Sequence, residues 1–169
     1  MAVGSKPHPF FYHPKIEIGM STIAKNNGLR THKVHKSYLK VTAILVACFG
    51  PICALGALPQ FSEPARWTLD LLSWPLDGKQ VYDPTTRFLS AITGGFLLGF
   101  GVTIWNLSTW VYDKAPEMVR RSVVIGLCSW FVLDSSASIA SGNGSNAIFN
   151  VIILLLFVGP LWLPVKEEF

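Results

Sequence analysis

The sequence predicts an all-α integral membrane protein: a bundle of four transmembrane helices preceded by an extended N-terminal arm. Four apolar stretches carry this prediction, at residues 41–58, 88–111, 122–140 and 147–163. Each is close to the ~20 residues that a helix needs to cross ~30 Å of hydrocarbon. Backbone amides in lipid must be satisfied within their own segment, so such stretches are expected to be helices.

Composition supports the same fold class. The chain has 169 residues, of which 50% are hydrophobic and only 14% are charged, and its mean hydropathy is +0.41. Soluble domains carry about 25% charged residues. The four spans and their connections occupy residues 41–165, which leaves a short tail at 166–169 and no room for a second folded domain.

Residues 1–40 form a basic extension ahead of the first span. Its early part contains three prolines, Pro7, Pro9 and Pro14. Proline disrupts helix interiors, which argues against an amphipathic targeting helix and favours extended structure over residues 1–36. A secretory signal is also excluded, because about forty residues precede the first apolar stretch. We expect a retained arm whose aromatic residues pack on a partner.

The distribution of Lys and Arg predicts the topology. Eleven of these residues lie before span 1, between spans 2 and 3, or in the tail, and three lie in the other connections. By the positive-inside rule, both termini are on the inner side. The prediction is a mitochondrial inner membrane or a bacterial plasma membrane. The basic residues flank spans, so a nucleic-acid partner is not expected.

Span 1 contains Pro51, which is expected to kink the helix near its middle. The outer loop that follows predicts a short helix, capped by Ser62 and with Pro64 in its first turn. This loop lies either on the membrane interface, where tryptophan is favoured, or over the bundle as a lid. Its apolar residues are Trp67, Leu71, Leu72 and Trp74.

Span 2 has a stripe of small residues, Ala91, Gly95 and Gly99, spaced four apart. Such stripes let helix backbones approach closely in lipid. We expect this face to pack inside the bundle, with packing against another protein as the alternative. Trp105 and Trp110, near the inner end of the span, are typical of interface anchors.

Span 3 contains the one acidic residue within the spans, Asp134, about 18 Å from the inner end at ~1.5 Å per residue. An intramembrane carboxylate usually faces a partner or water. Several polar residues lie at about the same depth in the membrane as Asp134, which predicts a polar cluster in the outer half. The first interpretation of this cluster is a structural Arg87–Asp134 ion pair, and the second is a proton or ligand site. The candidate members are Arg87, Asp134, Ser135, Ser138, Asn146 and Asn150.

Other chemistry has little support in the sequence. All four histidines precede span 1, which excludes bis-histidine haem inside the bundle. The His32 and His35 pair is taken as solvated residues at the membrane edge. The chain has no CxxC, no phosphate-binding loop, and no HExxH or GxSxG motif. We therefore expect no enzymatic activity, no metal and no cofactor, with structural lipids as the remaining candidate ligands.

Two segments, RFLSAITGGFLLGFGVTIW at 87–105 and VVIGLCSWFVLDSSASIASG at 123–142, resemble a family of small four-span membrane proteins of uncharacterised function, mainly bacterial. The resemblance covers about residues 41–165 and implies a four-helix fold and no particular activity. The positions that match its motifs are Arg87, Gly94, Gly95, Gly99, Gly101, Trp130, Asp134, Ser135 and Ser138.

These observations favour a non-catalytic accessory subunit of a multi-subunit membrane complex. The expected setting is an energy-transducing membrane, which means a respiratory, ATP-synthase or photosynthetic one, and the expected partners are other subunits and membrane lipids. The alternative is a small-molecule or lipid binder with an outer-half pocket at Asp134 and Arg87. An enzyme acting on a lipid or quinone ranks last, since it would need a second titratable group beside Asp134.

Overall fold

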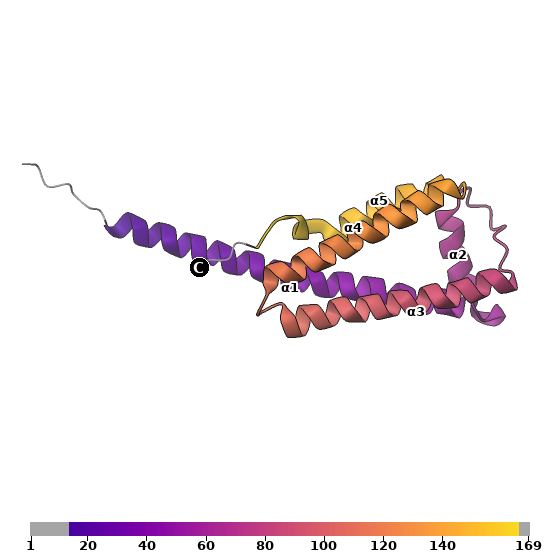
Figure 1. The fold of residues 1–169 in the computed structure, drawn as a ribbon, viewed down its shortest axis with the longest axis horizontal. Helices are drawn as coiled ribbons and strands as arrows, with labels where there is room; N and C mark the ends of the chain where they lie inside the picture. The colour runs from indigo at the N-terminus through magenta and orange to yellow at the C-terminus, as the bar shows by residue number, and fades with distance from the viewer. Residues whose placement is uncertain (1–13, 166–169) are drawn as a thin grey trace, which may run out of the picture.

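The computed structural model describes the backbone of residues 14–165 and the side chains from residue 30 onward. The described residues are helical apart from short connections (Figure 1). The long helices are α1 (Pro14–Leu55), α2 (Glu63–Leu72), α3 (Pro84–Asn106), α4 (Pro116–Ala140) and α5 (Gly144–Val158). Three single turns complete the chain, namely η1 (Pro59–Phe61), η2 (Leu107–Val111) and η3 (Gly159–Trp162).

The prediction of an all-α chain with four spans is confirmed. Within the described part of the chain, four helical segments are long and apolar enough to cross a membrane, by length and composition: Arg30–Leu55, Pro84–Val111, Pro116–Ala140 and Gly144–Trp162. The second of these includes η2, which continues α3 as a turn of π-helix. Much of the surface of these segments is apolar and exposed, as lipid contact requires, with Phe96 and Leu133 about three-quarters exposed.

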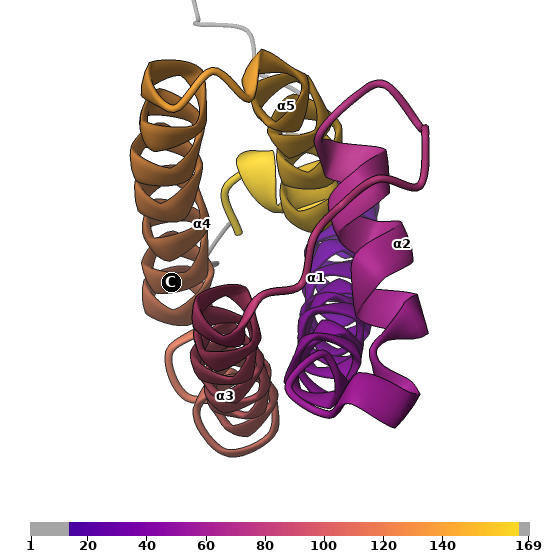
Figure 2. The same ribbon diagram turned by 90° about the vertical axis from the view of Figure 1, so that its right-hand side faces the viewer.

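The four spans form two helix pairs. α1 packs along α3 and α4 packs along α5, as Figure 2 shows in a view along the bundle. We call the end that carries η2 and η3 the arm end, and the opposite end the α2 end. The two pairs meet at the arm end through η2 and η3, and at the α2 end α2 contacts both α1 and α5.

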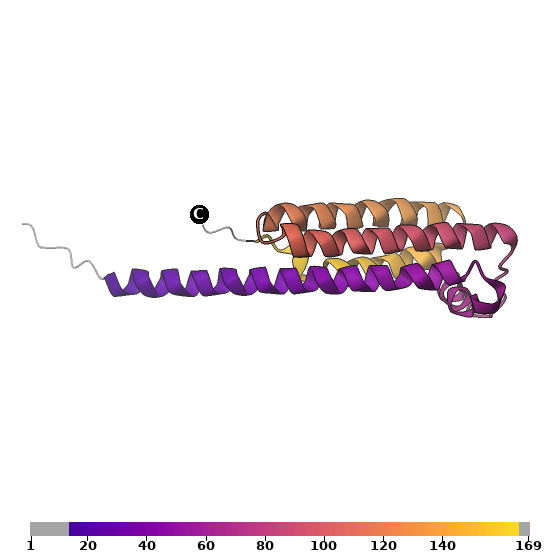
Figure 3. The ribbon, with the colours of Figure 1, turned by 90° about the horizontal axis from the view of Figure 1, so that it is seen from below.

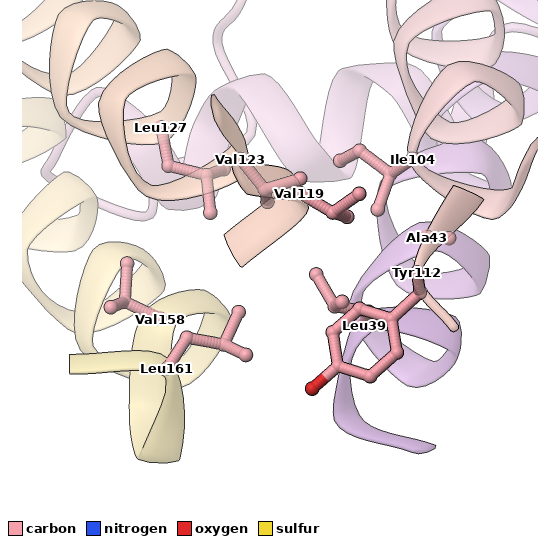
Figure 4. Packing of buried hydrophobic residues seen from close by; sticks show 9 residues of the cluster. All are labelled: Leu39, Ala43, Ile104, Tyr112, Val119, Val123, Leu127, Val158 and Leu161. Carbon is pink, nitrogen blue, oxygen red and sulfur yellow. The ribbon is translucent and has the colours of Figure 1, made fainter. Parts of the chain in front are cut away.

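A cluster of buried side chains joins the pairs at the arm end. Figure 4 shows the side chains from all four spans gathered between the helices. The cluster consists of Leu39, Ala43, Ile104, Tyr112, Val119, Val123, Leu127, Val158 and Leu161. In lipid, such packing stabilises mainly through van der Waals contact. Two hydrogen bonds add to it, from Tyr38 to the carbonyl of Leu156 and from Thr42 to the carbonyl of Phe157.

Glycine lets α1 and α3 touch along their backbones. A Cβ on Gly94 would lie 2.5 Å from the carbonyl oxygen of Gly50, and a Cβ on Gly101 would lie 2.6 Å from the amide of Ala47. Among the described residues, nothing lies within 4 Å of a Cβ built on Gly95 or Gly99. The prediction that the Gly95 and Gly99 face packs inside the bundle is therefore wrong, because α3 turns the neighbouring glycines towards α1.

The N-terminal arm is not extended where the structure describes it. α1 starts at Pro14 and runs for 42 residues, or about 63 Å at ~1.5 Å per residue. Pro14 stands in the first turn, where proline is favourable, and the other two arm prolines lie at positions 1–13, outside the described residues. The helix continues through Pro51, and Figure 3 shows its N-terminal part projecting beyond all the other helices.

α2 packs on the bundle, as one of the two predictions for the outer loop expects, and its place on the membrane interface stays a prediction. It contacts α1 and α5, while Trp67 and Trp74 remain more than half exposed. Pro64 lies in its first turn, but Ser62 donates its hydroxyl to the carbonyl of Pro59 at 3.0 Å and makes no cap. The end of α2 is fixed to α5, because Ser145 donates to the carbonyl of Leu72 at 2.7 Å.

Candidate functional site

Five polar side chains meet between α4 and α5 near the α2 end. Positions 134, 135 and 138 share one face of α4, and positions 146 and 150 share one face of α5, because residues three or four apart are neighbours on a helix. We call this group the Asp134 cluster. Its members are Asp134, Ser135, Ser138, Asn146 and Asn150.

The turn between the two helices sets their register. α4 ends at Ala140, and Gly142 adopts a φ of 85°, a left-handed conformation that favours glycine. The amide of Asn143 donates to the carbonyl of Ser138 at 2.8 Å, and the amide of Gly142 donates to that of Ile139 at 3.1 Å. This pair of bonds is a Schellman motif. It reverses the chain so that Asn146 faces the last turns of α4.

Two asparagine amides hold the Asp134 carboxylate. Asn150 Nδ2 donates to Asp134 Oδ2 at 2.8 Å, and Asn146 Nδ2 approaches the same oxygen at 3.4 Å. The same nitrogens also reach the serines, with 3.2 Å to Ser135 Oγ and 2.7 Å to Ser138 Oγ. Asn150 is 2% exposed and both serines are 8% exposed, so the cluster is largely removed from its surroundings.

The Asp134 carboxylate has no cationic partner in the part of the chain that the structure describes. The ion pairs found there involve other acidic groups, and Asp134 Oδ1 accepts no hydrogen bond from a described residue. Asp134 itself is half-buried. A carboxylate in an apolar segment is costly unless its charge is offset, so this group stands out as the chemically unusual one of the bundle.

Arg87 does not join the cluster. Its Nη1 donates to the carbonyl of Gly56 at 3.1 Å, and its guanidinium lies 5.6 Å from the centre of the Tyr82 ring. A cation beside the last carbonyls of α1 is favourable because the C-terminal end of a helix carries partial negative charge. The predicted Arg87–Asp134 ion pair is therefore wrong. Arg87 belongs to the α1–α3 pair, and Asp134 faces α5.

A second polar network, at the arm end, was not predicted from the sequence. Glu117 accepts two hydrogen bonds from Arg120, at 2.6 and 2.7 Å, one from Arg121 at 2.7 Å and one from the amide of Val165 at 3.1 Å. Arg120 also donates to the carbonyl of Leu161 at 2.5 Å. The network fastens the start of α4 to η3 and the chain after it.

A sequence signal for this network exists. Glu117 precedes Arg120 and Arg121 by three and four residues, which is the spacing of ion pairs on a helix. The Glu117 and Arg120 side chains are only 14% and 11% exposed. The role of the network is structural, because each charged group in it already has its partner.

Beside this network, His32 and Tyr112 stack with their ring centres 4.8 Å apart. The prediction that His32 and His35 are solvated is wrong for His35, which is 1% exposed and, like His32, lies within the first apolar helical segment. Tyr112 is fully buried, and burial together with the nearby carboxylates of Asp113 and Glu117 raises the pKa of its phenol to about 12. Lys36 forms an ion pair with Asp113 at the same end. Among the described residues, no group of three His, Cys, Asp or Glu side chains is placed to hold a metal ion.

No protein-family model, curated protein or solved structure matches this chain. Function must therefore be argued from the geometry of the chain itself. The resemblance to small four-span bacterial proteins stays a prediction. Of its motif positions, Asp134, Ser135 and Ser138 lie in the Asp134 cluster, and Gly94 and Gly101 make the close contact of α3 with α1.

Proposed function

We propose that this protein is a non-catalytic accessory subunit of a multi-subunit membrane complex. The projecting part of α1 carries the proposal. The helix starts at Pro14, and His32 and Lys36 are among the described side chains that hold it to the rest of the bundle. The N-terminal part of this helix runs past all the other helices (Figure 3). Most of the stability of a helix in a protein comes from tertiary packing, so a partner surface would stabilise this projecting part.

The sequence of the projecting part indicates the chemistry of that surface. Between residues 14 and 33 it carries Lys15, Lys25, Arg30 and Lys33 against a single acidic residue, Glu17. A basic helix next to a membrane is attracted to acidic protein surfaces and to anionic lipid headgroups. The partner is therefore an acidic face of a neighbouring subunit, close to the membrane surface.

The bundle would serve as the anchor. Its spans expose large apolar side chains to lipid, and its own polar networks are internal. The finer assignment, to a respiratory, ATP-synthase or photosynthetic membrane with both termini on the inner side, is part of the same proposal. Its support is the charge distribution, and the identity of the co-purifying chains decides it.

The rival function, a ligand pocket shared by Asp134 and Arg87, loses its basis. The two side chains belong to different helix pairs, and Arg87 is occupied by Gly56 and Tyr82. No pocket that requires both of them is supported by this geometry.

The test is purification from native membranes in mild detergent. A full-length chain tagged at Phe169 is compared with a variant that lacks residues 1–29, which spares the His32 and Lys36 contacts. A matched variant changes Lys15, Lys25 and Arg30 to Gln and keeps the helix length.

The full-length chain should bring down a stoichiometric membrane complex, and both variants should lose most of it while their bundles unfold as in the parent. Recovery of the full-length chain alone, from membranes that contain it at natural abundance, would overturn the subunit proposal. A complex that survives in both variants would overturn the role given to the arm.

A further inference from the structure

The Asp134 cluster poses a problem of charge. Its single carboxylate lies about six residues, or ~9 Å along the helix, from the end of α4 at Ala140. No cationic side chain among the described residues neutralises it. Two amide donors to Oδ2 reduce the cost of the charge, but they leave its net value unchanged. One unit of positive charge beside the carboxylate would remove the imbalance.

The cluster also has the right atoms for a hard cation. Its five side chains come from two helices, and every one of them carries an oxygen. The two amide nitrogens now lie 2.7–3.4 Å from the carboxylate and serine oxygens. Turning each amide by 180° exchanges its nitrogen for its oxygen at nearly the same place. Each amide oxygen would then lie beside the Asp134 carboxylate and one serine hydroxyl, so that oxygens of all five side chains would be neighbours.

We propose that the Asp134 cluster is a binding site for a monovalent cation of sodium size, held between α4 and α5. Oxygen ligands are those that hard cations prefer. A monovalent ion leaves the cluster neutral, whereas a divalent ion would leave one uncompensated positive charge in an apolar segment. The site is independent of the partner surface proposed for α1.

The spacing of the ligands selects the size of the ion. Around an ion that binds oxygen at ~2.4 Å, as calcium does and as the similarly sized sodium ion would, neighbouring ligands in octahedral array lie ~3.4 Å apart. The contacts in the cluster are hydrogen bonds of 2.7–3.4 Å, at or below this value, so a sodium ion would move the ligands apart and a larger ion would move them further. Potassium is larger and needs wider spacing, so the site should favour sodium or lithium over potassium.

The ion would reach the site from the α2 end. Asp134 is half-buried and its Oδ1 accepts no hydrogen bond from the residues that the structure describes, so one ligand atom is available before either amide turns. The other ligands join as Asn146 and Asn150 rotate. Because these residues come from α5, the bound ion would tie α5 to α4 more tightly.

The experiment measures unfolding of the purified full-length chain in detergent, in sodium, lithium, potassium or choline chloride at equal ionic strength. A ligand that binds only the folded state raises the free energy of unfolding by RT ln(1 + [L]/Kd), where [L] is the free ligand concentration. Sodium and lithium should raise the unfolding midpoint once their concentration exceeds Kd, and further with the logarithm of concentration, and potassium and choline should not. Asp134→Asn should abolish the response.

Two serine variants make the test independent of how Asp134→Asn folds. Ser135→Ala removes one ligand and should raise the sodium concentration at which stabilisation sets in, which reports Kd, by about ten- to a hundredfold. Ser136→Ala changes the exposed neighbour, which is outside the cluster, and should leave that concentration unchanged.

Two results would overturn the proposal. The first is an equal midpoint in all four salts. The second is a midpoint that depends on pH through Asp134 and not on sodium, since this would make the proton the ligand of the carboxylate.

Discussion

The contact between α1 and α3 can be tested with two alanine substitutions one residue apart. In Gly94→Ala the new Cβ would lie 2.5 Å from the carbonyl oxygen of Gly50 and 2.6 Å from the amide of Ala54. Ordinary van der Waals contact begins near 3.4 Å, so the helices must separate by about 0.9 Å. The obstacles are backbone atoms, which cannot turn aside as a flexible side chain would.

The matched control is Gly95→Ala, whose Cβ has no neighbour within 4 Å among the described residues. Both substitutions replace glycine by alanine in the middle of α3, so both gain a similar helix propensity, at most ~1 kcal/mol. Overpacking costs about 1–3 kcal/mol, and only Gly94→Ala incurs it. The free energy of unfolding of Gly94→Ala should therefore be about 1–3 kcal/mol below that of Gly95→Ala.

The assay is equilibrium unfolding of the purified chain by SDS in mixed micelles, followed by helical circular dichroism. Gly101→Ala, whose Cβ would meet the amide of Ala47 at 2.6 Å, should behave like Gly94→Ala. Equal stability of the Gly94 and Gly95 variants would refute the arrangement of α3 on α1. A larger loss at Gly95 would restore the helix face predicted from the small-residue stripe.

Two further predictions concern the arm end. Gly159→Ala should lower the free energy of unfolding by about 1–3 kcal/mol, because φ is 37° at this position and a Cβ would collide with the Tyr38 hydroxyl. Gly144→Ala is the control and should change the free energy of unfolding little, because a Cβ there meets open space. Thermal unfolding of the parent and the two variants measures the difference. Glu117→Gln should lower the free energy of unfolding by about 3 kcal/mol, because it leaves the buried Arg120 unpaired. Arg121→Gln removes only an exposed partner of Glu117 and should lower it by less than ~1 kcal/mol. Comparable losses in the two variants, measured by SDS unfolding, would contradict this network.

The four spans could be predicted because length and hydropathy belong to each segment alone. The helical arm could have been predicted too. The prolines that suggested extended structure, Pro7, Pro9 and Pro14, all lie at or before the first turn of α1. From Lys15 to Phe49 the chain contains no proline, which leaves the helix uninterrupted over that length.

The rotation of α3 is harder to predict. Gly95 and Gly99 share one face, and Gly94 and Gly101 share another, and both spacings are helical. The helix that packs against α3 decides which of these two faces is buried. α1 presents the small residues Ala43, Ala47, Gly50 and Ala54, and these meet Gly94 and Gly101. A comparison of small-residue patterns between spans, rather than within one span, carries the missing signal.

The Arg87 error has a different cause. Depth along the membrane was estimated from position within each span, and Arg87 and Asp134 do lie towards the same end of the bundle. Depth says nothing about the order of helices around the bundle axis. Here α3 pairs with α1 and α4 pairs with α5, so equal depth does not bring the two side chains together. Asn146 and Asn150 are nearer because a tight turn connects their helix to α4.

The two proposals use opposite ends of the bundle, so each can serve as the control for the other. Glu117 and Asp134 are seventeen residues apart on α4, about 26 Å along its axis. The Asp134 cluster joins α4 only to α5, whereas the arm leaves the bundle beyond the buried cluster that holds both pairs. Asp134→Asn should therefore abolish the sodium response and keep the partner, and removal of residues 1–29 should do the reverse. Loss of both properties in either variant would mean that the two helix pairs respond as one unit.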